Sequence, residues 1–594
     1  MNRTLQRRSS YRNCLLRVFF RIQILFSVTI LTSAECGFYL AQSTIPGGGL
    51  GTFAGQRYRT GDIIGQPGIV IPVIDYRAHH PELEQYETFF ESYCWGLQIF
   101  PHLNVEAVEE SVAFVPGVGA ALNYMIPLVN VDGPGNRIEM SNEQLHRSKD
   151  PGVGAFTPFF NRVMIAQKEI EPGFELFDSY GEDYFTQREY LYGQIPLSED
   201  YSKADEFIVS LTSLQNNLCA NSGLCSNAIE HYNFYHEAFE LMTGKLSVIW
   251  PSRVLNALPK DHKLSYTMAQ GGVGMMQYNS SSRKLDWLEK NGVCADNLLV
   301  RKSELDEQAG RGAFAKRFLP KGSIVAPAPL LHMRKSLLTM HPVYADEYGE
   351  FHINLTAQAN RYQLILNYCF GHPQSSVSLC SYGFDTNLIN HSKEKSNVKV
   401  TWNYNLSLHP EWLQQAPEKW IDTVHTGLVM DYIAKRDIQP GEEILLDYGD
   451  EWEAAWKQHL STWKPPLDAK TYIPAVELND RVADVISMTH ETPRHNEDYV
   501  SLYCRPVYRK WYGALTAEEE RELLTEFNET DLYPIKNYCR AIDRFEVNGE
   551  VMYTVEFFTI DRANNITAIG PAYDVLLVVP RDVFFYEDKE YSRE

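Results

Sequence analysis

The chain has 594 residues, more than one hydrophobic core accommodates, and at roughly 150 residues per domain this length predicts three or four structural units. A hydrophobic fraction of 44% with 22% charged residues excludes a disordered or fibrous protein. The formal net charge of −22 opposes binding to nucleic acid, so we expect no direct nucleic-acid partner and a basic ligand instead.

The first 34 residues have the layout of a secretory signal peptide. They contain six arginines and no acidic residue, followed by an apolar run from Ile22 to Ile30 and the small-residue stretch Thr32-Ser33-Ala34. The run is shorter than the roughly 20 residues of a spanning helix, so cleavage is expected rather than an uncleaved anchor. We predict a signal peptide at residues 1–34, a location in the secretory pathway or outside the cell, and no stable membrane span after cleavage.

Short blocks recur in the same order along the chain, with offsets of 261, 261, 267 and 268 residues. The matched pairs are Gly49–Ala54 with Gly310–Ala315, Gly61–Ile64 with Gly322–Val325, Leu122-Asn123 with Ile389-Asn390, and Pro172–Gly181 with Pro440–Gly449. Ordered blocks at a nearly constant offset predict two copies of one structural unit. We place these copies at residues 43–190 and 305–460.

Within each unit, short apolar segments alternate with Gly, Pro and Asn turns, which predicts small curved β-sheets with few helices. The segments are Ile69–Val73, Arg162–Ile165, Asn397–Trp402 and Glu443–Leu446. Between the units, residues 191–304 are predicted to form a helical insertion or linker, because their apolar residues have helical spacing. That spacing is found in Ser202–Leu214, Trp250–Ala257 and Lys284–Lys290.

Residues 466–594 are predicted to form a small C-terminal β domain, with a barrel or a sandwich as the expected form. Val551–Ile560 and Val575–Val579 have strand-like composition, and Ala517–Glu526 has the composition of a charged helix. The acidic and aromatic tail Phe584–Glu594 is expected to be a solvated chain end.

The ten cysteines form no Cys-x-x-Cys or Cys/His pattern with zinc spacing, so no metal site is expected. Candidate disulfides, if the chain is secreted, are Cys219 with Cys225, Cys369 with Cys380, and Cys504 with Cys539, and free buried thiols are an equal alternative. Glycosylation sequons stand at Asn279, Asn354, Asn405, Asn528 and Asn565. A chain of this length contains about four by composition alone, so they add little support for secretion.

Three motifs of the second unit resemble those of the SET-domain methyltransferases. They are Gly310-x-Gly312, Leu388-Ile389-Asn390-His391-Ser392 and Gly441-Glu442-Glu443-Ile444-Leu445-Leu446-Asp447-Tyr448-Gly449, in the family's order. The resemblance implies a mainly β fold with α insertions, built from two SET-like β-clip units with a knot-like C-terminal crossing of two of these motifs. It also implies a protein-lysine methyltransferase that uses S-adenosylmethionine, with a basic protein as the lysine substrate.

The resemblance assigns cofactor contacts to Gly310, Gly312, Asn390 and His391, and the catalytic role to Tyr448. These residue types suit the roles, because paired glycines permit a close backbone approach and Asn and His side chains offer hydrogen-bonding groups. A phenolic oxygen can hold a methyl group through weak C–H···O contacts and can orient an amine. Taken singly, a Gly-x-Gly sequence is usually a plain turn and an Asn-His pair is usually structural.

Residues near the tyrosine motif receive more ordinary interpretations. Trp452 and Trp456 are expected to pack in the core, with channel walls or adenine stacking as the alternative. Glu443, matched by Glu175, is interpreted as a carboxylate that supports the fold rather than as a general base.

Several positions depart from the family pattern. Asn387 stands where many members have arginine, and the spacing from His391 to Asn397 is longer than usual. In the first unit, Tyr124 takes the place of His391, although Tyr180 persists. We therefore expect one potential active site, with the first unit as a degenerate copy that serves as a structural or substrate-positioning partner.

A rival function is a non-catalytic secreted or surface protein that uses the SET-like scaffold for binding, since a fold alone does not confer an activity. The motif set of the second unit favours the enzyme. The signal peptide favours the scaffold, because the methyl donor is not expected in secretory compartments. A nuclear protein with a histone substrate is disfavoured by the apolar run that begins at Ile22.

Overall fold

The computed structural model describes residues 36–81, 92–95, 111–133, 139–140, 151–152, 155–157, 159–222, 228–245, 251–259, 262–305, 309–345, 351–372, 374–423, 425–465, 473, 475–480, 486, 500–504, 537–547, 549–560, 566–568, 577–580 and 584–588. The expected signal peptide at 1–34 and the expected helix Ala517–Glu526 lie outside these residues. Across the described ranges, no helix combines the length and the apolar character needed to cross a membrane.

The first part of the chain is built from short antiparallel strands. They are β1 (Phe38–Gln42), β2 (Leu50–Ala54), β3 (Ile63–Gly68), β4 (Ile71–Ile74), β5 (Cys94–Trp95), β6 (Ser111–Phe114), β7 (Val131–Asp132), β8 (Glu139–Met140), β9 (Phe159–Phe160) and β10 (Arg162–Ala166). Helices α2 (Tyr76–His79), α4 (Glu182–Gln187) and α5 (Glu189–Tyr192) are short. The predicted strand Arg162–Ile165 is confirmed, and the predicted strand at Ile69 begins two residues later, at Ile71.

The second part is also built mainly from short strands, which surround a larger sheet of order β19-β20-β14-β23-β22. Its strands are β12 (Leu298–Lys302), β13 (Arg311–Ala315), β14 (Ile324–Arg334), β15 (Thr339–Met340), β16 (Val343–Ala345), β17 (Phe351–Ile353), β18 (Arg361–Tyr362), β19 (Cys369–Gly371), β20 (Val377–Ser381), β21 (Asn390–His391), β22 (Val398–Trp402), β23 (Thr426–Ala434) and β24 (Leu445–Leu446). Helix α11 (Asp450–Thr462) follows. The mainly β character with few helices agrees with the sequence prediction.

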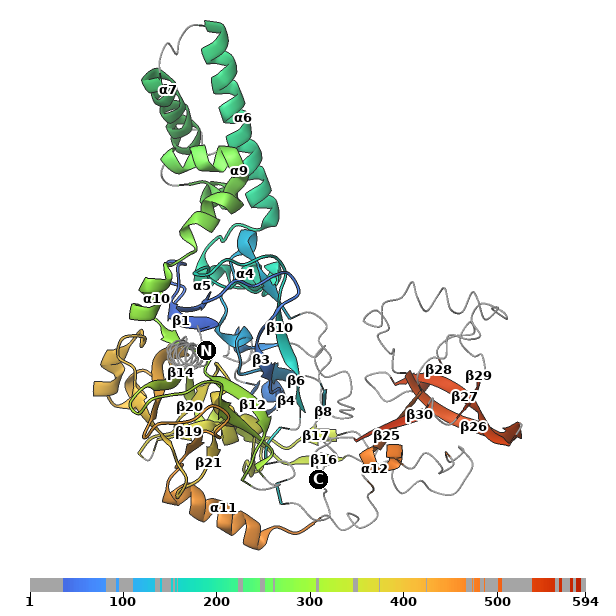
Figure 1. Cartoon of the computed structure of the whole chain (residues 1–594). Helices are drawn as coiled ribbons and strands as arrows, with labels where there is room; N and C mark the ends of the chain where they lie inside the picture. Colours follow the sequence, from blue (N-terminus) through green and yellow to red (C-terminus); the bar gives the residue numbers. More distant parts are fainter. Residues whose placement is uncertain are drawn as a thin grey trace, which may run out of the picture.

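In the described residues between the two parts, the α-helices are α6 (Ser198–Ser222), α7 (Ala228–Glu240), α8 (Ser252–Ala257), α9 (His262–Ser280) and α10 (Leu285–Asn291). Helices α6 to α9 pack around a hydrophobic cluster of their own and extend away from the strands (Figure 1). The three predicted helical segments overlap α6, α8 and α10. Helix α9 was not predicted, because Gly271 and Gly272 interrupt its sequence, and Gly272 bends it with a φ of 76°.

The described part of the C-terminal segment is one antiparallel sheet. It contains β25 (Val500–Cys504), β26 (Asn537–Val547), β27 (Glu550–Ile560), β28 (Ile566–Ala568), β29 (Leu577–Pro580) and β30 (Phe584–Asp588), next to α12 (Ala475–Asp480). The expectation of a solvated tail from Phe584 is wrong for its first residues. They pair with β25, and Phe584 is buried because its ring contacts Tyr553.

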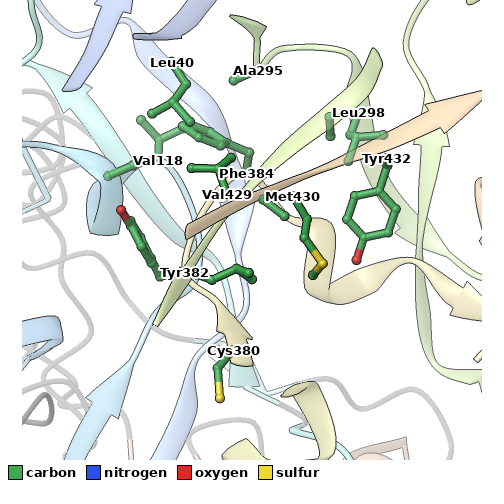
Figure 2. Close-up of a cluster of buried hydrophobic side chains, with 14 of the residues drawn as sticks. Leu40, Val118, Ala295, Leu298, Cys380, Tyr382, Phe384, Val429, Met430 and Tyr432 are labelled. Carbon is green, nitrogen blue, oxygen red and sulfur yellow. The ribbon is translucent and has the colours of Figure 1, made fainter. Parts of the chain in front are cut away.

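The two β-rich parts share one hydrophobic core. Leu40 and Val118 of the first part lie beside Phe384 and Val429 of the second (Figure 2). The rings of Phe38 and Phe384 stack with their centroids 5.9 Å apart. Burial of these side chains against each other supplies the main attraction between the two parts.

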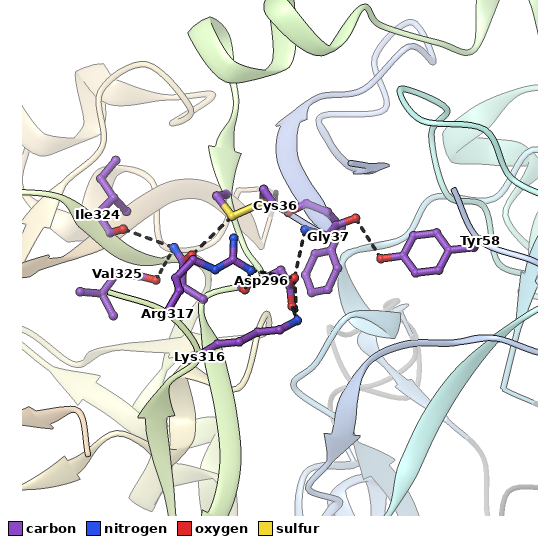
Figure 3. The surroundings of a disulfide bond; sticks show 11 residues. Cys36, Gly37, Tyr58, Asp296, Lys316, Arg317, Ile324 and Val325 are labelled. Atoms are coloured by element: carbon purple, nitrogen blue, oxygen red, sulfur yellow. Dashed lines mark hydrogen bonds and ion pairs between the residues drawn. A yellow bond between two sulfur atoms is a disulfide. The ribbon is translucent and has the colours of Figure 1, made fainter. Parts of the chain in front are cut away.

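A disulfide bond and a buried carboxylate also join the two parts (Figure 3). Cys36 is bonded to Cys294 on β11 (Val293–Cys294), and β1 pairs with β11. Next to them, Asp296 Oδ2 accepts the N–H of Gly37 at 3.0 Å, and its carboxylate pairs with Lys316 at 2.8 Å. The start of the first part is thereby fixed to the strand that leads into the second.

The sequence missed the bond between Cys36 and Cys294, whereas the predicted bond between Cys369 and Cys380 is confirmed. Cys219 and Cys539 are each in a disulfide. Their predicted partners, Cys225 and Cys504, have side chains outside the described set. Among the described cysteines, Cys94 is free.

Candidate functional site

The carboxylate of Glu443 holds the three motifs of the second unit together. Its Oε1 accepts hydrogen bonds from Ser303 Oγ at 2.7 Å and from Asn390 Nδ2 at 3.3 Å. Its Oε2 accepts the N–H of Glu304 at 2.8 Å. Asn390 Nδ2 also donates to the carbonyl of Arg311 at 3.0 Å. Glu443 is buried, and the predicted role of its carboxylate in supporting the fold is confirmed.

Local structure explains why glycine is present at both positions of the Gly-x-Gly motif. A Cβ at Gly312 would lie 2.3 Å from Glu443 Oε1, so any side chain there would displace the carboxylate. Gly310 has a φ of 59°, in the left-handed region that favours glycine. The fold itself therefore requires glycine at 312, independently of the cofactor contact predicted for it.

An equivalent arrangement occurs in the first unit around Glu175. Its carboxylate accepts hydrogen bonds from Ser43 Oγ at 2.7 Å, from the N–H of Thr44 at 2.7 Å and from Asn123 Nδ2 at 3.1 Å. A Cβ at Gly51 would lie 2.1 Å from Glu175 Oε1. The two units thus have matching hydrogen-bond networks at the positions that the sequence offsets align.

A buried amide positions the strand that leads to Tyr448. Asn397 Nδ2 donates to the carbonyl of Glu443 at 2.7 Å, and Asn397 Oδ1 accepts the N–H of Leu445 at 2.8 Å. Asn130 makes the same two bonds in the first unit, at 2.9 and 2.8 Å. In the second unit, the Asn397 amide thus positions β24, which pairs in parallel with β21.

Tyr448 directs its hydroxyl inward while 37% of its surface stays exposed. The hydroxyl donates to the carbonyl of Ile389, and burial raises its pKa well above the ordinary tyrosine value. The N–H of Tyr448 donates to His391 Nδ1 at 3.0 Å. In this bond Nδ1 is the acceptor, which leaves Nε2 as the ring nitrogen that can donate. The structure therefore brings Asn390, His391 and Tyr448 together.

The expectation of core packing is wrong for Trp452. Its surface is 38% exposed, and α11 has no buried residue. The Trp452 ring instead covers His391 and Tyr448, with centroid distances of 4.8 and 5.0 Å, and Trp456 stacks behind it at 6.1 Å. After Gly449, α11 follows the surface rather than entering the core, so its aromatic side chains form one wall of the site.

Two further tyrosines belong to this site, and the sequence did not single them out. Burial raises the pKa of Tyr368 and of Tyr432 well above the ordinary tyrosine value, and the nearby Tyr448 raises each further. Tyr432 is buried on β23, and Tyr368 ends a short 3-10 helix, Leu364–Tyr368. Neither belongs to one of the three motifs, so only the folded chain identifies them.

Two buried oxygen acceptors lie beside the strand with the paired glycines. Asp385 Oδ1 and Asn387 Oδ1 have no hydrogen-bond partner among the described residues. Asp385 precedes the 3-10 helix Thr386–Leu388, and Asn387 is its central residue. This helix packs against β13. Burial raises the pKa of Asp385 to about 7, opposed by the charge of Arg311. Phe384 and Asp385 also have positive φ angles of 60° and 58°, a strain typical of functional sites.

The first unit places different rings at the matching positions. Tyr180 donates its hydroxyl to the carbonyl of Leu122, as Tyr448 does to Ile389. Tyr124, in place of His391, has no ring nitrogen to accept the N–H of the tyrosine. Its ring instead packs against Tyr180 at 5.4 Å. The two sites therefore share a framework and differ in the groups that they expose.

The site contains no evident metal centre. Among the described side chains, no group of three or more His, Cys, Asp or Glu residues is arranged to hold a metal ion.

Together these observations define a class of protein: a β-rich domain in which paired glycines, an Asn-His strand and a buried tyrosine meet at one site. Residues 310–449 match the family model for the SET domain. The match confirms the resemblance stated for the second unit. The first unit lies outside the matched residues.

Solved structures similar to the chain overlap with only part of it. One is the polycomb repressive complex 2 of Chaetomium thermophilum, with 15% identity, a TM-score of 0.16, and coverage of 30% of this chain and 17% of that one. Another is CpSET8 from Cryptosporidium, with 18% identity, a TM-score of 0.15, and coverage of 27% and 58%. No match is found among curated proteins.

Proposed function

We propose that the second unit transfers a methyl group from S-adenosylmethionine to a lysine side chain of a protein. One observation carries this proposal. Within the residues that match the model of the SET domain, a family of protein-lysine methyltransferases, the Glu443 carboxylate lies against Gly312 and accepts a hydrogen bond from Asn390. His391 follows Asn390, and its ring accepts the N–H of Tyr448. The negative charge of the chain supports a basic protein as the substrate.

The residues at the site fit this methyl donor. The unpartnered acceptors Asp385 Oδ1 and Asn387 Oδ1 suit an ammonium group, and the aromatic rings of His391 and Trp452 suit an adenine ring. The backbone at Gly310 would hold the remaining part of the donor. When bound, the donor supplies an electrophilic methyl group on a sulfonium.

The chain's own residues align and desolvate the accepting amine. Tyr448 stays protonated at neutral pH because burial raises its pKa, so its oxygen orients the amine and does not remove a proton. Tyr368 and Tyr432 add further hydroxyls around it. Desolvation among these rings lowers the pKa of a lysine amine and favours the neutral nucleophile. Alignment of that lone pair with the methyl group then supplies most of the acceleration.

Further parts of the proposal concern the architecture. The network around Glu175 supports a degenerate SET-like copy at residues 43–190, and Tyr124 supports the lack of a second active site. The parallel pairing of β21 with β24 supports a knot-like crossing within 305–460. The helices support an insertion at 191–304, and the sheet of β25 to β30 supports a separate domain at 466–594.

The non-catalytic scaffold is the second candidate function, and the disulfide bonds favour it. Cys36 with Cys294 and Cys369 with Cys380 are typical of oxidising compartments, where the methyl donor is not expected. Titration calorimetry with S-adenosylmethionine distinguishes the two functions, because the scaffold has no need to bind it.

Tyr448→Phe is expected to lower methyl transfer to basic lysine peptides by about 100-fold or more, because the oxygen that orients the amine is lost. Transfer is measured with labelled S-adenosylmethionine, and affinity for the donor is expected to change by less than about threefold. Tyr404→Phe, which alters an exposed tyrosine of the same unit, serves as the matched control. Equal transfer by Tyr448→Phe and the unaltered chain would refute the assigned role.

We also propose that the chain passes through the secretory pathway, supported by its disulfides and by exposed sequon residues Asn279 and Asn405. Protein recovered from the medium of expressing eukaryotic cells is expected to lose mass on treatment with an N-glycosidase. The loss should be smaller for Asn279→Gln and Asn405→Gln and unchanged for Asn291→Gln, which lies outside any sequon. Retention of all the protein in the cytosol, without glycan, would contradict this route.

A further inference from the structure

One segment of the first unit crosses the second unit beside the candidate site. Its described residues are Pro151–Gly152, Ala155–Thr157 and Phe159–Phe160, which we call the crossing segment. The N–H of Val70 donates to the carbonyl of Phe159 at 3.0 Å, which anchors the segment to its own unit. Thr157 is buried, so the segment is packed rather than solvated.

Hydrogen bonds join the crossing segment to the second unit at three points. Asn367 Nδ2 donates to the carbonyl of Ala155 at 2.7 Å, and the N–H of Thr157 donates to the Tyr368 hydroxyl at 2.8 Å. His459 Nε2 is bonded to the carbonyl of Pro151 at 2.8 Å. Tyr368 interacts with Tyr448, and His459 lies on α11, which also carries Trp452. The segment therefore contacts Tyr368 and the helix that carries Trp452.

The crossing segment also covers the Gly-x-Gly strand. Phe156 Cε2 lies 2.9 Å from the point where a Cβ at Gly310 would stand, so the ring rests directly on the glycine backbone. Four residues further on, the Phe160 ring lies under the guanidinium of Arg311, with 4.4 Å from Cζ to the ring centroid. The rings of Phe156 and Phe160 of the first unit thus pack on the Gly-x-Gly strand of the second unit.

We propose that the crossing segment is a cover for the donor site, supplied by the same chain, and that Phe156 competes with the methyl donor for the face of Gly310. This inference rests on the proposed function, which places the donor against that backbone. Only molecules in which Phe156 has moved away from Gly310 bind the donor. The apparent affinity is therefore the intrinsic affinity multiplied by the fraction of such molecules. The first unit would then regulate access to the one active site.

Titration calorimetry compares the full chain with its Phe156→Ala variant, with S-adenosylmethionine and S-adenosylhomocysteine as the probes. Binding to the variant is expected to be about tenfold tighter or more, because no ring has to leave Gly310. Phe156 is only half-buried, and the segment's hydrogen bonds use backbone groups of other residues, so the fold is retained. Phe318→Ala removes an exposed phenyl ring of the second unit and is expected to leave the affinity unchanged.

A second variant and a second measurement keep the test independent of Phe156. Asn367→Ala removes one bond to the segment at an exposed residue and is expected to tighten binding by about threefold. In the unaltered chain, the donor is expected to accelerate hydrogen exchange of the Thr157 amide, because its bond to Tyr368 opens.

The outcomes separate this inference from the proposed function. Tighter binding by Phe156→Ala together with faster exchange at Thr157 supports the cover. Donor binding that is equal in Phe156→Ala overturns the cover alone. Weaker binding also overturns it and makes the ring part of the binding wall. If neither the unaltered chain nor the variant binds the donor, the proposed function fails, and the cover fails with it.

Discussion

A chain in which Cys36 and Cys294 are both replaced by serine is expected to lose about 5 kcal/mol of its free energy of unfolding. The bond joins residues 258 positions apart, and in the chain-entropy treatment a cross-link of that span strongly restricts the unfolded chain. The folded chain keeps the pairing of β1 with β11 and the bond from Gly37 to Asp296. Urea unfolding followed by tryptophan fluorescence measures the change.

The bond between Cys369 and Cys380 provides an internal comparison. It spans only 11 residues, so its removal is expected to cost about 3 kcal/mol by the same treatment. The order of the two losses is the decisive quantity, because strain and residual structure affect their absolute size. A larger loss from the short span would show that the long bond does not act mainly on the unfolded chain.

Glu443→Ala is expected to lower the free energy of unfolding by about 3 to 5 kcal/mol. The substitution removes the acceptor of Ser303 Oγ, of the N–H of Glu304 and of Asn390 Nδ2 at once. These donors are partly or fully buried, so water replaces the carboxylate poorly. Because the two units share a core, we expect these two units to unfold together in one transition, whose urea midpoint is compared at an unchanged slope.

Two further variants serve as comparisons for Glu443→Ala, one at the matching buried carboxylate and one at an exposed carboxylate. Glu175→Ala removes the matching acceptor of the first unit, which is fully buried, and is expected to cost at least as much. Glu394→Ala alters an exposed loop residue and is expected to change stability by less than about 0.5 kcal/mol. If Glu443→Ala and Glu394→Ala had similar midpoints, the carboxylate would not hold the motifs together.

The sequence located the parts of the site that depend on local chemistry. Gly312 and Glu443 are required by one hydrogen-bond arrangement, and the same pair recurs as Gly51 and Glu175, so the internal offsets revealed both. The strands around Arg162 and Val551 were also predicted, because alternating apolar residues and nearby turns specify them locally. The SET-domain match covers the residues on which the resemblance was based.

The features that escaped prediction depend on contacts between distant segments. Nothing in the sequence around Phe156 or Tyr368 indicates that the first lies on Gly310 or that the second interacts with Tyr448. Trp452 was assigned to the core because tryptophan is usually buried, but α11 leaves the core after Gly449. The pairing of Cys36 with Cys294 likewise requires a register that only the folded chain specifies.

The common core has a consequence for how the chain can change over generations. Leu40 and Phe38 of the first unit are buried among Phe384 and Val429 of the second, so a substitution that loosens one unit is felt by the other. A substitution in the interior of the first unit is therefore expected to lower the stability of the second unit as well. If Tyr448 has the proposed role in methyl transfer, a requirement for that activity extends to the interior of the first unit.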